Sequence, residues 1–482
     1  MARLGTAGGL RKNHHSGDFG NRRFSPSGLF FVGFTAMHRS FDTIAAIATA
    51  PGRGGVGIVR VSGPHAAEVA RRCLGRLPSP RQALYGPFLD ARGEVIDDGI
   101  ALYFPGPHSY TGEDVLELQG HGGPVVMDLL LGACLEMGCR MARAGEFTER
   151  AFLNDRMDLA QAEAVADLID AGSAAAVRSA RRSLEGGFSR QVDLILSALT
   201  ELRVFVEADL DFSEEELDLL AEGDIQYRIE SLLDQLATLT EQARQGNLLR
   251  EGAHLVIAGR PNAGKSSLLN RLVDREAAIV TAIPGTTRDV LREHLSLDGL
   301  PLHLVDTAGL RESDDPVEQE GIRRAWAEIE RADLVLLVVD ATQGEGEAEG
   351  GIRRRLPSRL PVITVYNKLD RLTEVPADAS DVLFISARTG EGISTLREAL
   401  KAQLHYSGHP EGLFTARRRH LDALARTRDH VQAANDQLII TRATELVAEE
   451  LRLAQEALGE ITGRVSADDL LGEIFSSFCI GK

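Results

Sequence analysis

The spacing of apolar residues changes several times along this chain. Between residues 43 and 155, short apolar runs such as 58–61 and 114–118 are separated by turns, which predicts a strand-rich domain. From residue 157 to residue 250, apolar residues recur at helical spacing, the usual mark of a helix face packed on other helices. The clearest members of this face are Ile195, Leu199, Leu202 and Val206.

A different pattern fills residues 251–407. Short apolar runs alternate there with helix-like segments, which is typical of an α/β unit with a buried sheet. A second helical tract, from about 415 to 475, follows the turn-forming residues 407–410. Two helical tracts around a complete α/β unit predict one helical domain with that unit inserted, because insertion is easy when a domain's termini lie close together. The apolar runs are 254–258, 302–305, 333–339, 361–366 and 382–385.

Residues 259–266 carry the strongest chemical signal. They read G-R-P-N-A-G-K-S and fit the phosphate-loop pattern G-x-x-x-x-G-K-[ST] between a predicted strand and a predicted helix. Backbone N–H groups and a helix N-terminus in this context hold a polyphosphate. Lys265 would reach the terminal phosphates, and the Ser266 hydroxyl would ligate Mg²⁺. The sequence therefore predicts a nucleotide-binding protein.

Three further motifs, each after a predicted strand, identify the nucleotide. In D-T-A-G at 306–309, the carboxylate can hold Mg²⁺ through water and the Gly309 N–H can sense the γ-phosphate. In N-K-L-D at 367–370, the Asp370 carboxylate can accept from N1–H and the exocyclic amine of guanine, whereas adenine would leave it unpaired at about 1–3 kcal/mol. S-A-R at 386–388 would close over the base. An open α/β sheet binds ligands at these strand ends, so the predicted ligand is GTP.

The catalytic apparatus departs from the Ras pattern. Leu310 stands where Ras-type GTPases carry a Gln, so another group has to orient the attacking water. The segment 311–318 is rich in carboxylates and is either the source of that group or only a solvated loop. No arginine finger is evident. Oxygens of Asn262 and of the loop 281–289, where Thr287 suits Mg²⁺, could hold a monovalent cation instead.

Composition narrows the class of protein. A chain of 482 residues has room for two to four domains. Its net charge of −18 disfavours a protein that grips nucleic acid mainly through a basic surface, so a nucleic-acid substrate would need a local basic patch or a basic partner. The densest basic run, R-R-R-H at 417–420, is more typical of a solvated helix face.

The cysteines and the N-terminal segment narrow the class of protein further. The four cysteines form no C-x-x-C pair and have no accompanying His cluster, which disfavours zinc and disulfides and fits a reducing cytoplasm. No apolar stretch is long enough to span a membrane. Residues 1–36 are basic and acid-poor, so we expect a transit peptide or, better, an over-long start before Met37, disordered either way. The cysteines are Cys73, Cys134, Cys139 and Cys479.

Two motif matches are rejected. Residues 52–57 fit G-x-G-x-x-G, but a strand pattern follows where a dinucleotide fold needs a helix. The end of the chain resembles a prenylation signal, but Gly481 and Lys482 are poor choices for its last two places. A frayed tail is the ordinary expectation there, although Cys479 beside a terminal lysine and carboxylate could form part of a site.

With these pieces assembled, residues 41–482 resemble the MnmE (TrmE) family of tRNA-modification GTPases. The resemblance implies a multidomain α/β + α fold with a strand-rich α+β domain at 37–155 that binds tetrahydrofolate and forms the homodimer. It also implies a helical domain at 156–250 plus 408–482 and an inserted Ras-like P-loop G domain at 251–407. The matching segments are D-T-I at 42–44, P-G-R-G-G-V-G at 51–57, L-E-L-Q-G-H-G-G at 116–123, G-E-F-T-E-R-A-F at 145–152, the GTPase motifs and C-I-G-K at 479–482.

The resemblance also implies an activity. A cytoplasmic protein of this family works with a FAD- and NADH-dependent MnmG-type partner in a heterotetramer. Together they add an aminomethyl or carboxymethylaminomethyl group to C5 of the wobble uridine of certain tRNAs. The one-carbon donor is a folate, 5,10-methylene- or 5-formyl-tetrahydrofolate, and the G domains dimerise with K⁺.

Site residues carry over by motif. In the family's pattern K⁺ is held by Asn262, Thr281, Ile283 and Thr286, and Mg²⁺ by Ser266 and Thr287. Glu318 orients the attacking water, which explains why this chain can carry Leu310 where Ras-type GTPases carry a Gln. Folate contacts fall on Arg60, Glu117, Lys482 and Arg156, where relatives often have a lysine, and Cys479 is a candidate thiol. The implied GTP contacts are Asn262, Ala263, Gly264, Lys265, Ser266, Ser267, Thr281, Ala282, Ile283, Pro284, Gly285, Thr286, Thr287, Asp306, Thr307, Ala308, Gly309, Asn367, Lys368, Leu369, Asp370, Ser386, Ala387 and Arg388.

Two alternatives stay open. A ribosome-assembly GTPase would be an RNA-binding switch, but the tract 408–482 lacks the GXXG loop or aromatic stacking motif of common RNA-binding modules. A folate-dependent aminomethyl transferase with a merely regulatory G domain would differ by acting on tRNA without GTP hydrolysis.

Overall fold

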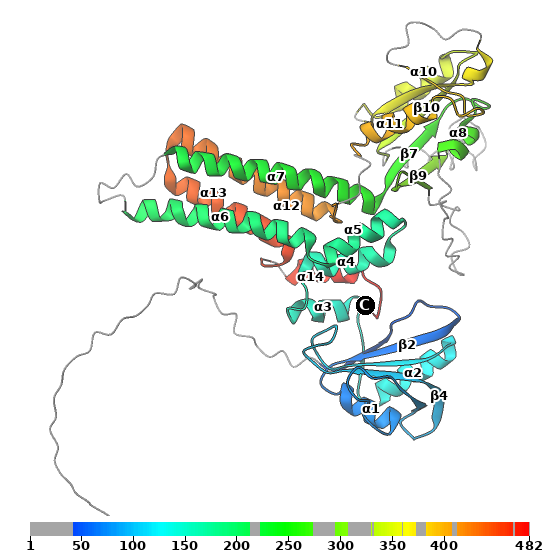
Figure 1. Cartoon of the computed structure of the whole chain (residues 1–482), viewed down its shortest axis with the longest axis vertical. Coiled ribbons are helices and arrows are strands. Elements are labelled where there is room, and N and C mark those ends of the chain that lie inside the picture. The colour runs from blue at the N-terminus through cyan, green and yellow to red at the C-terminus, as the bar shows by residue number, and fades with distance from the viewer. Residues whose placement is uncertain are drawn as a thin grey trace, which may run out of the picture. The chain divides into compact units, whose positions relative to one another are not determined.

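The computed structural model describes residues 42–212, 222–272, 295–306, 329, 332–358, 360–372, 382–406, 412–465 and 468–481. Figure 1 shows their helices and strands in chain order. The fold is a strand-rich α+β unit, a helical bundle and an open α/β sheet, so the predicted fold class is confirmed. The prediction for residues 1–36 lies outside the described residues.

The N-terminal unit is a six-stranded sheet in the order β3-β4-β5-β2-β1-β6. Neighbouring strands are antiparallel except β1 and β6. Helices α1 (Ala66–Leu74) and α2 (Pro124–Glu136) pack on it over a core that includes Val59, Leu116 and Leu130. Residues 52–57 lead into β2 and not into a helix, as predicted. The strands are β1 (Ile44–Ile47), β2 (Gly54–Ser62), β3 (Leu84–Leu89), β4 (Val95–Phe104), β5 (Val115–Gly122) and β6 (Arg140–Met141).

A buried arginine fastens α3 (Glu146–Leu153) to this unit. The Arg150 side chain is 1 % exposed, and its guanidinium donates to Asp42, Glu113 and Glu146. Glu146 is itself buried and also accepts from Arg140. A buried charge is tolerated only when it is paired in this way.

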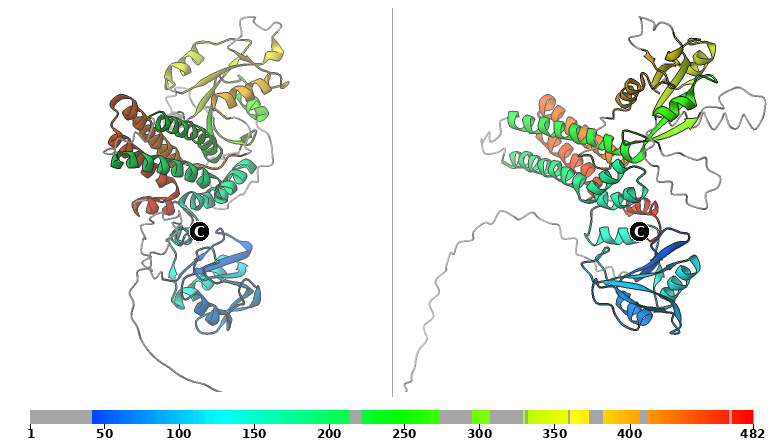
Figure 2. Two further views of the ribbon diagram at one scale, coloured as in Figure 1. Left: turned by 60° about the vertical axis from the view of Figure 1, so that its left-hand side comes forward. Right: turned by 45° about the vertical axis from the view of Figure 1, so that its right-hand side comes forward.

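The helical unit combines two stretches that are far apart in the chain (Figures 1 and 2). Helix α13 packs on α6, and α12 packs on both α7 and α13. The face predicted from helical spacing, Ile195 to Val206, is buried in their common core. The helices are α4 (Leu159–Asp170), α5 (Ala174–Leu184), α6 (Gly187–Phe212), α7 (Glu222–Glu251), α12 (Arg418–Asp436), the π-helix η2 (Gln437–Thr441), α13 (Thr444–Thr462) and α14 (Asp468–Ser476).

The basic run at 417–420 is mostly internal, so its prediction as a solvated face is wrong. Glu163 on α4 is 1 % exposed and accepts two hydrogen bonds of 2.7 Å from Arg419. It also lies 2.8 Å from Nε2 of buried His420. Burial alone would raise the pKa of Glu163, but His420 and Arg419 together lower it. Only Arg418 of the run is exposed.

A neighbouring carboxylate extends this cluster. Asp167 Oδ1 accepts from Arg250 at 2.7 Å and from Arg417 at 2.8 Å. Arg250 lies near the end of α7, just before the inserted α/β unit, and Arg417 caps α12 just after it. The two ends of the insertion are thereby joined to the same side chain of α4.

The α/β unit is a six-stranded sheet in the order β12-β11-β10-β7-β9-β8. Its strands are parallel except for the hairpin of β8 and β9. Two apolar clusters lie against the sheet, so its central strands are buried. The elements are β7 (Ala253–Ala258), α8 (Lys265–Leu272), β8 (Leu295–Leu297), β9 (Leu300–Asp306), β10 (Leu334–Asp340), α10 (Glu347–Arg355), β11 (Val362–Asn367), the 3-10 helix η1 (Leu369–Arg371), β12 (Leu383–Phe384) and α11 (Ile393–Gln403).

Candidate nucleotide-binding site

The predicted phosphate loop joins β7 to α8. Asn262 has φ +61°, a left-handed conformation that Asn adopts more readily than most residues. Gly264 has φ +92°, and a Cβ there would lie 2.2 Å from the Asn367 side-chain nitrogen. Only glycine fits this position, so the loop is built for close approach of the backbone.

Lys265 occupies the first position of α8. Its ammonium donates to the carbonyls of Gly259 and Arg260, both at 2.9 Å, so the side chain lies over the loop. Ser266 follows in the same turn and is exposed. A cation and a hydroxyl at a helix N-terminus are the groups that a polyphosphate with Mg²⁺ requires.

Asn367 connects this loop to the predicted base-binding segment. Its side chain is 2 % exposed, donates to the Ala263 carbonyl at 2.8 Å and accepts from the Ala387 N–H at 2.9 Å. Two segments far apart in the chain are thus held in one fixed relation by a single amide. This contact explains why the motif requires Asn at its first position.

Asp370 and Lys368 are positioned by partners of their own. Asp370 Oδ1 accepts from the Ser386 hydroxyl at 2.6 Å, and that hydrogen bond lowers the pKa of Asp370. The Lys368 ammonium lies 2.6 Å from Asp340 Oδ2 at the end of β10. Asp370 is therefore an ionised acceptor, as guanine recognition needs.

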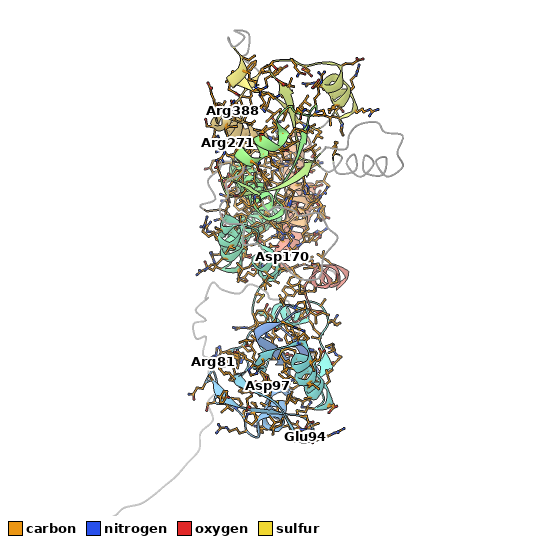
Figure 3. All side chains as sticks on the ribbon, turned by 90° about the vertical axis from the view of Figure 1, so that its right-hand side faces the viewer. Arg81, Glu94, Asp97, Asp170, Arg271 and Arg388 are labelled. Carbon is orange, nitrogen blue, oxygen red and sulfur yellow. The ribbon has the colours of Figure 1, made fainter. Side chains whose placement is uncertain are left out.

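A cavity of about 620 Å³ opens between these segments. This volume is in the ordinary range for a small-ligand site. Arg271 bounds it and donates to the carbonyls of Ala387 at 3.2 Å and Arg388 at 2.7 Å (Figure 3). The lining residues are Gly264, Ser267, Asn270, Arg271, Asn367, Lys368, Asp370, Arg371, Ala387 and Arg388.

The described part of the chain brings together the first phosphate loop and the two base-binding motifs. Leu369 and Ser386 lie beside the cavity residues in sequence, and Asp306 ends β9 next to β7. Eleven residues predicted for this nucleotide site lie outside the described residues. They are Thr281, Ala282, Ile283, Pro284, Gly285, Thr286, Thr287, Thr307, Ala308, Gly309 and Glu318. All the predicted K⁺ and Mg²⁺ ligands, and the water-orienting role of Glu318, stay predictions.

Sequence reasoning missed several groups at this site. Asn270, Arg271 and Arg371 line the cavity but belong to no motif. Asp340 was not predicted, because it directly follows an apolar run that reads only as a strand. A carboxylate at the C-terminal end of such a strand could have indicated it, because open α/β sheets bind ligands there. Hydrogen bonds from Lys368 and Thr342 lower the pKa of Asp340 against the effect of burial.

The predicted folate residues Arg60 and Glu117 are paired across β2 and β5. Their side chains form a 3.0 Å salt bridge and are 20 % and 16 % exposed. The Arg60 guanidinium lies 5.4 Å from the Tyr110 ring centre and 5.7 Å from that of Phe147. These two rings, which the sequence did not reveal, hold the guanidinium in place by cation–π contact.

The C-terminal tail reaches the same place and is not frayed. Ile480 pairs with Ala144, and the Arg60 guanidinium donates to the Gly481 carbonyl at 3.4 Å. Gly481 has φ +93°, and a Cβ there would lie 2.3 Å from the Ile47 carbonyl, so the tail packs directly on backbone. The expected fraying is therefore wrong for residues up to 481.

The other residues predicted for the folate site and the candidate thiol are placed as follows. Arg156 is exposed and lies against Gly112, where a Cβ would meet its Cγ at 3.3 Å. Lys482 lies outside the described residues. Cys479 is a free, exposed thiol, whereas Cys73, Cys134 and Cys139 are buried. Among the described residues, no three or more His, Cys, Asp or Glu side chains gather into a group that could hold a metal ion, and no helix is long and apolar enough to cross a membrane.

Comparisons with known proteins cover nearly the whole chain. Residues 43–156 match a family model described as the GTP-binding protein TrmE N-terminus, and residues 159–479 match one described as the MnmE helical domain. A tRNA modification GTPase MnmE of Erwinia tasmaniensis is 59 % identical over 92 % of this chain and 99 % of its own. A protein of the same name from Yersinia pseudotuberculosis is 58 % identical over the same shares.

Among solved structures, a variant of Aquifex aeolicus Era bound to GDP.AlF4- is 26 % identical over 37 % of this chain and 66 % of its own. Its TM-score is 0.24, too low to support an argument.

The α/β sheet, the phosphate loop and the Asn367–Asp370 motif define a P-loop GTPase. Within that class, the matches over almost the full length decide the family. The chain belongs to the MnmE family of tRNA modification GTPases.

Proposed function

We propose that this protein hydrolyses GTP as one component of a complex that modifies tRNA. The modification is an aminomethyl or carboxymethylaminomethyl group on C5 of the wobble uridine. The observation that carries the GTP assignment is the amide of Asn367, which joins the phosphate loop to the base-binding segment. The tRNA assignment is supported by the names of relatives that match over 99 % of their own length.

In this proposal the cations complete the phosphate site. Ser266 fits a Mg²⁺ ligand because its hydroxyl is exposed in the first turn of α8, and Thr287 would be the second. Asn262 fits one K⁺ ligand because it lies exposed in the loop, and Thr281, Ile283 and Thr286 would supply the rest. A cation there supplies the positive charge that an arginine finger supplies elsewhere. Glu318 would orient the water.

The N-terminal unit is proposed to bind a tetrahydrofolate through Arg60, Glu117, Arg156 and Lys482. The carboxylate of Glu117 accepts from amino and N–H groups of a planar heterocycle, and the Arg60 guanidinium fixes that carboxylate. The partial burial of the pair, with two aromatic rings against the Arg60 guanidinium, fits a flat, polar ligand. Cys479, whose carbonyl accepts from the Gly145 N–H at 3.3 Å, is held close to this site by the docked tail.

The wider arrangement is also part of the proposal. We infer domains at 37–155, 156–250 plus 408–482, and 251–407, with a homodimer formed through the first and K⁺-dependent pairing of the third. An MnmG-type partner that uses FAD and NADH completes a heterotetramer in the cytoplasm.

The first test is GTP hydrolysis by the full chain in K⁺ and in Na⁺ at equal ionic strength. Strong K⁺ dependence is expected. Glu318→Ala should bind GTP but not turn it over, and Glu312→Ala, a change in the same acidic segment, should keep its activity. Equal rates in both salts would refute the cation role of Asn262, and full activity of Glu318→Ala would refute the role of Glu318.

A further inference from the structure

Four arginines lie close together at one end of α1. Arg71 and Arg72 are in its last turn, and Arg76 and Arg81 follow in the connection to β3. All four are exposed. We call them the arginine patch. Figure 3 labels Arg81 at the outer margin of its unit.

Contacts with β4 and the loop after it hold the patch together. The Arg81 N–H donates to the Tyr103 carbonyl at 2.9 Å, and its guanidinium donates to the His108 carbonyl. Arg71 is near the same tyrosine, because it opposes the rise in the pKa of Tyr103 that burial and Asp114 cause. Tyr103 of β4 is therefore near both Arg71 and Arg81.

The arginine patch stands out in this acidic chain because four exposed arginines close together in the sequence all lack carboxylate partners among the described residues. Elsewhere arginines on the described surface are commonly paired, as Arg140 is with Asp42, Arg228 with Asp224 and Arg426 with Glu460. Among the described residues, no carboxylate lies within ion-pair distance of any patch guanidinium. The nearest acid in sequence, Glu68, pairs with His65 at the other end of the helix.

Helix stabilisation accounts for only half of the patch. Cations in the last turn of a helix interact favourably with its dipole, which explains Arg71 and Arg72. Arg76 and Arg81 lie beyond the helix, where this effect has ended. Arg81 also has φ +58°, a left-handed conformation in which glycine or asparagine is favoured. A long cationic side chain kept at a strained position indicates a use for the side chain itself.

We propose that the arginine patch binds the phosphate backbone of tRNA. This proposal rests on the proposed function, in which tRNA is the substrate. A chain with net charge −18 disfavours a polyanion overall, so direct contact by this chain, as opposed to a basic partner, requires a local group of cations. The run at 417–420 does not provide one, because Arg417, Arg419 and His420 face buried carboxylates. Arginines bind phosphates without reading bases, so the patch positions the tRNA and does not select it.

The test is binding of a fluorescein-labelled tRNA transcript to the full-length protein, measured by anisotropy over a series of salt concentrations. The double variant Arg72→Glu/Arg76→Glu removes two patch cations whose side chains form no hydrogen bond or ion pair with the described residues. The matched control is Arg244→Glu/Arg418→Glu, which makes the same charge change at exposed arginines of the helical unit. GTP hydrolysis and thermal unfolding of each protein are measured in parallel.

The expected result is at least tenfold weaker tRNA binding by the patch variant, with a log–log salt slope shallower by about 1.5–2. The control should bind within twofold of the wild type, and hydrolysis should be the same in all three. Equal tRNA affinity of the patch variant and the wild type, or an equal loss of affinity in the control, would overturn the proposal. Wild-type protein that hydrolyses GTP but does not bind the transcript would also overturn it. Absence of hydrolysis in the wild type would refute the proposed function itself.

A partner protein would give a different outcome. If the patch variant keeps tRNA affinity but loses sedimentation with an FAD-dependent partner, the patch is a protein-docking surface and the RNA proposal fails.

Discussion

Replacing Asn367 by alanine tests whether one amide holds the nucleotide site together. The substitution removes a donor to the Ala263 carbonyl and an acceptor from the Ala387 N–H in a place that is 2 % exposed. Each buried group left without a partner costs about 1–3 kcal/mol. Since one group belongs to the phosphate loop and the other to the base-binding segment, we expect about 2–6 kcal/mol in total, shared between folding and binding.

The two contributions are separated by two assays. Urea unfolding of the nucleotide-free protein reports the folding share, and titration with a fluorescent GDP analogue reports the binding share. A binding loss of about 2 kcal/mol corresponds to roughly thirtyfold weaker affinity. Asn247→Ala is the control, because its amide makes only a 3.4 Å contact with Glu251, away from the site.

One result would refute this reasoning. If Asn367→Ala kept GDP affinity within threefold of the wild type and unfolded at the same urea concentration, the amide would not join the two segments. A loss of folding stability alone, with affinity unchanged, would restrict its role to packing.

Three further predictions concern other places in the structure. Arg150→Met should lower the free energy of unfolding by about 3–5 kcal/mol at neutral pH, measured in urea, because a buried ion-pair network loses its cation. Hydrogen bonds from Arg140 and, to a smaller extent, from Arg150 lower the pKa of Asp42 to about 2 and, against the effect of burial, that of Glu146 to about 2. The network therefore stabilises the fold at pH values above the ordinary pKa values of 3.8 and 4.5, and this stabilisation is lost as the pH falls towards 2. The difference between variant and wild type should therefore shrink in acid, and a constant difference would contradict it. Gly264→Ala should abolish binding of the GDP analogue while leaving the urea transition of the helical unit in place, because its Cβ would collide with Asn367. Gly481→Ala should release the tail, seen as faster carboxypeptidase digestion, and an unchanged digestion rate would show that the tail is not docked there.

Much of the fold follows from local patterns. Helical spacing identified Ile195, Leu199, Leu202 and Val206, and all four are buried, because periodic burial is a direct consequence of helix geometry. The phosphate loop and the base-binding motifs were also found, since each is short and contiguous. The domain boundaries and all of the metal and folate ligands stay predictions.

The two wrong predictions share one cause, which is contact between residues far apart in the sequence. The run at 417–420 gives no sign of Glu163, which lies more than 250 residues earlier in the chain and draws Arg419 and His420 inward. Likewise, nothing in the sequence of the tail indicates that it contacts Arg60, whose guanidinium donates to the Gly481 carbonyl 421 residues further along the chain. Charge patterning describes a segment's preference for water, and a buried opposite charge overrides that preference.

The shared anchor at Asp167 has a consequence for the independence of the helical unit. Arg250 and Arg417 each lie within 2.8 Å of one carboxylate oxygen, so the bundle closes on itself at the point where the α/β unit departs and returns. Its core draws on both flanking stretches and is complete without the insert. A gene rearrangement at this junction could add or remove the nucleotide-binding unit without opening the bundle. The helical framework should therefore hold together without the α/β unit, and replacing residues 251–407 by a short linker is the direct way to test this.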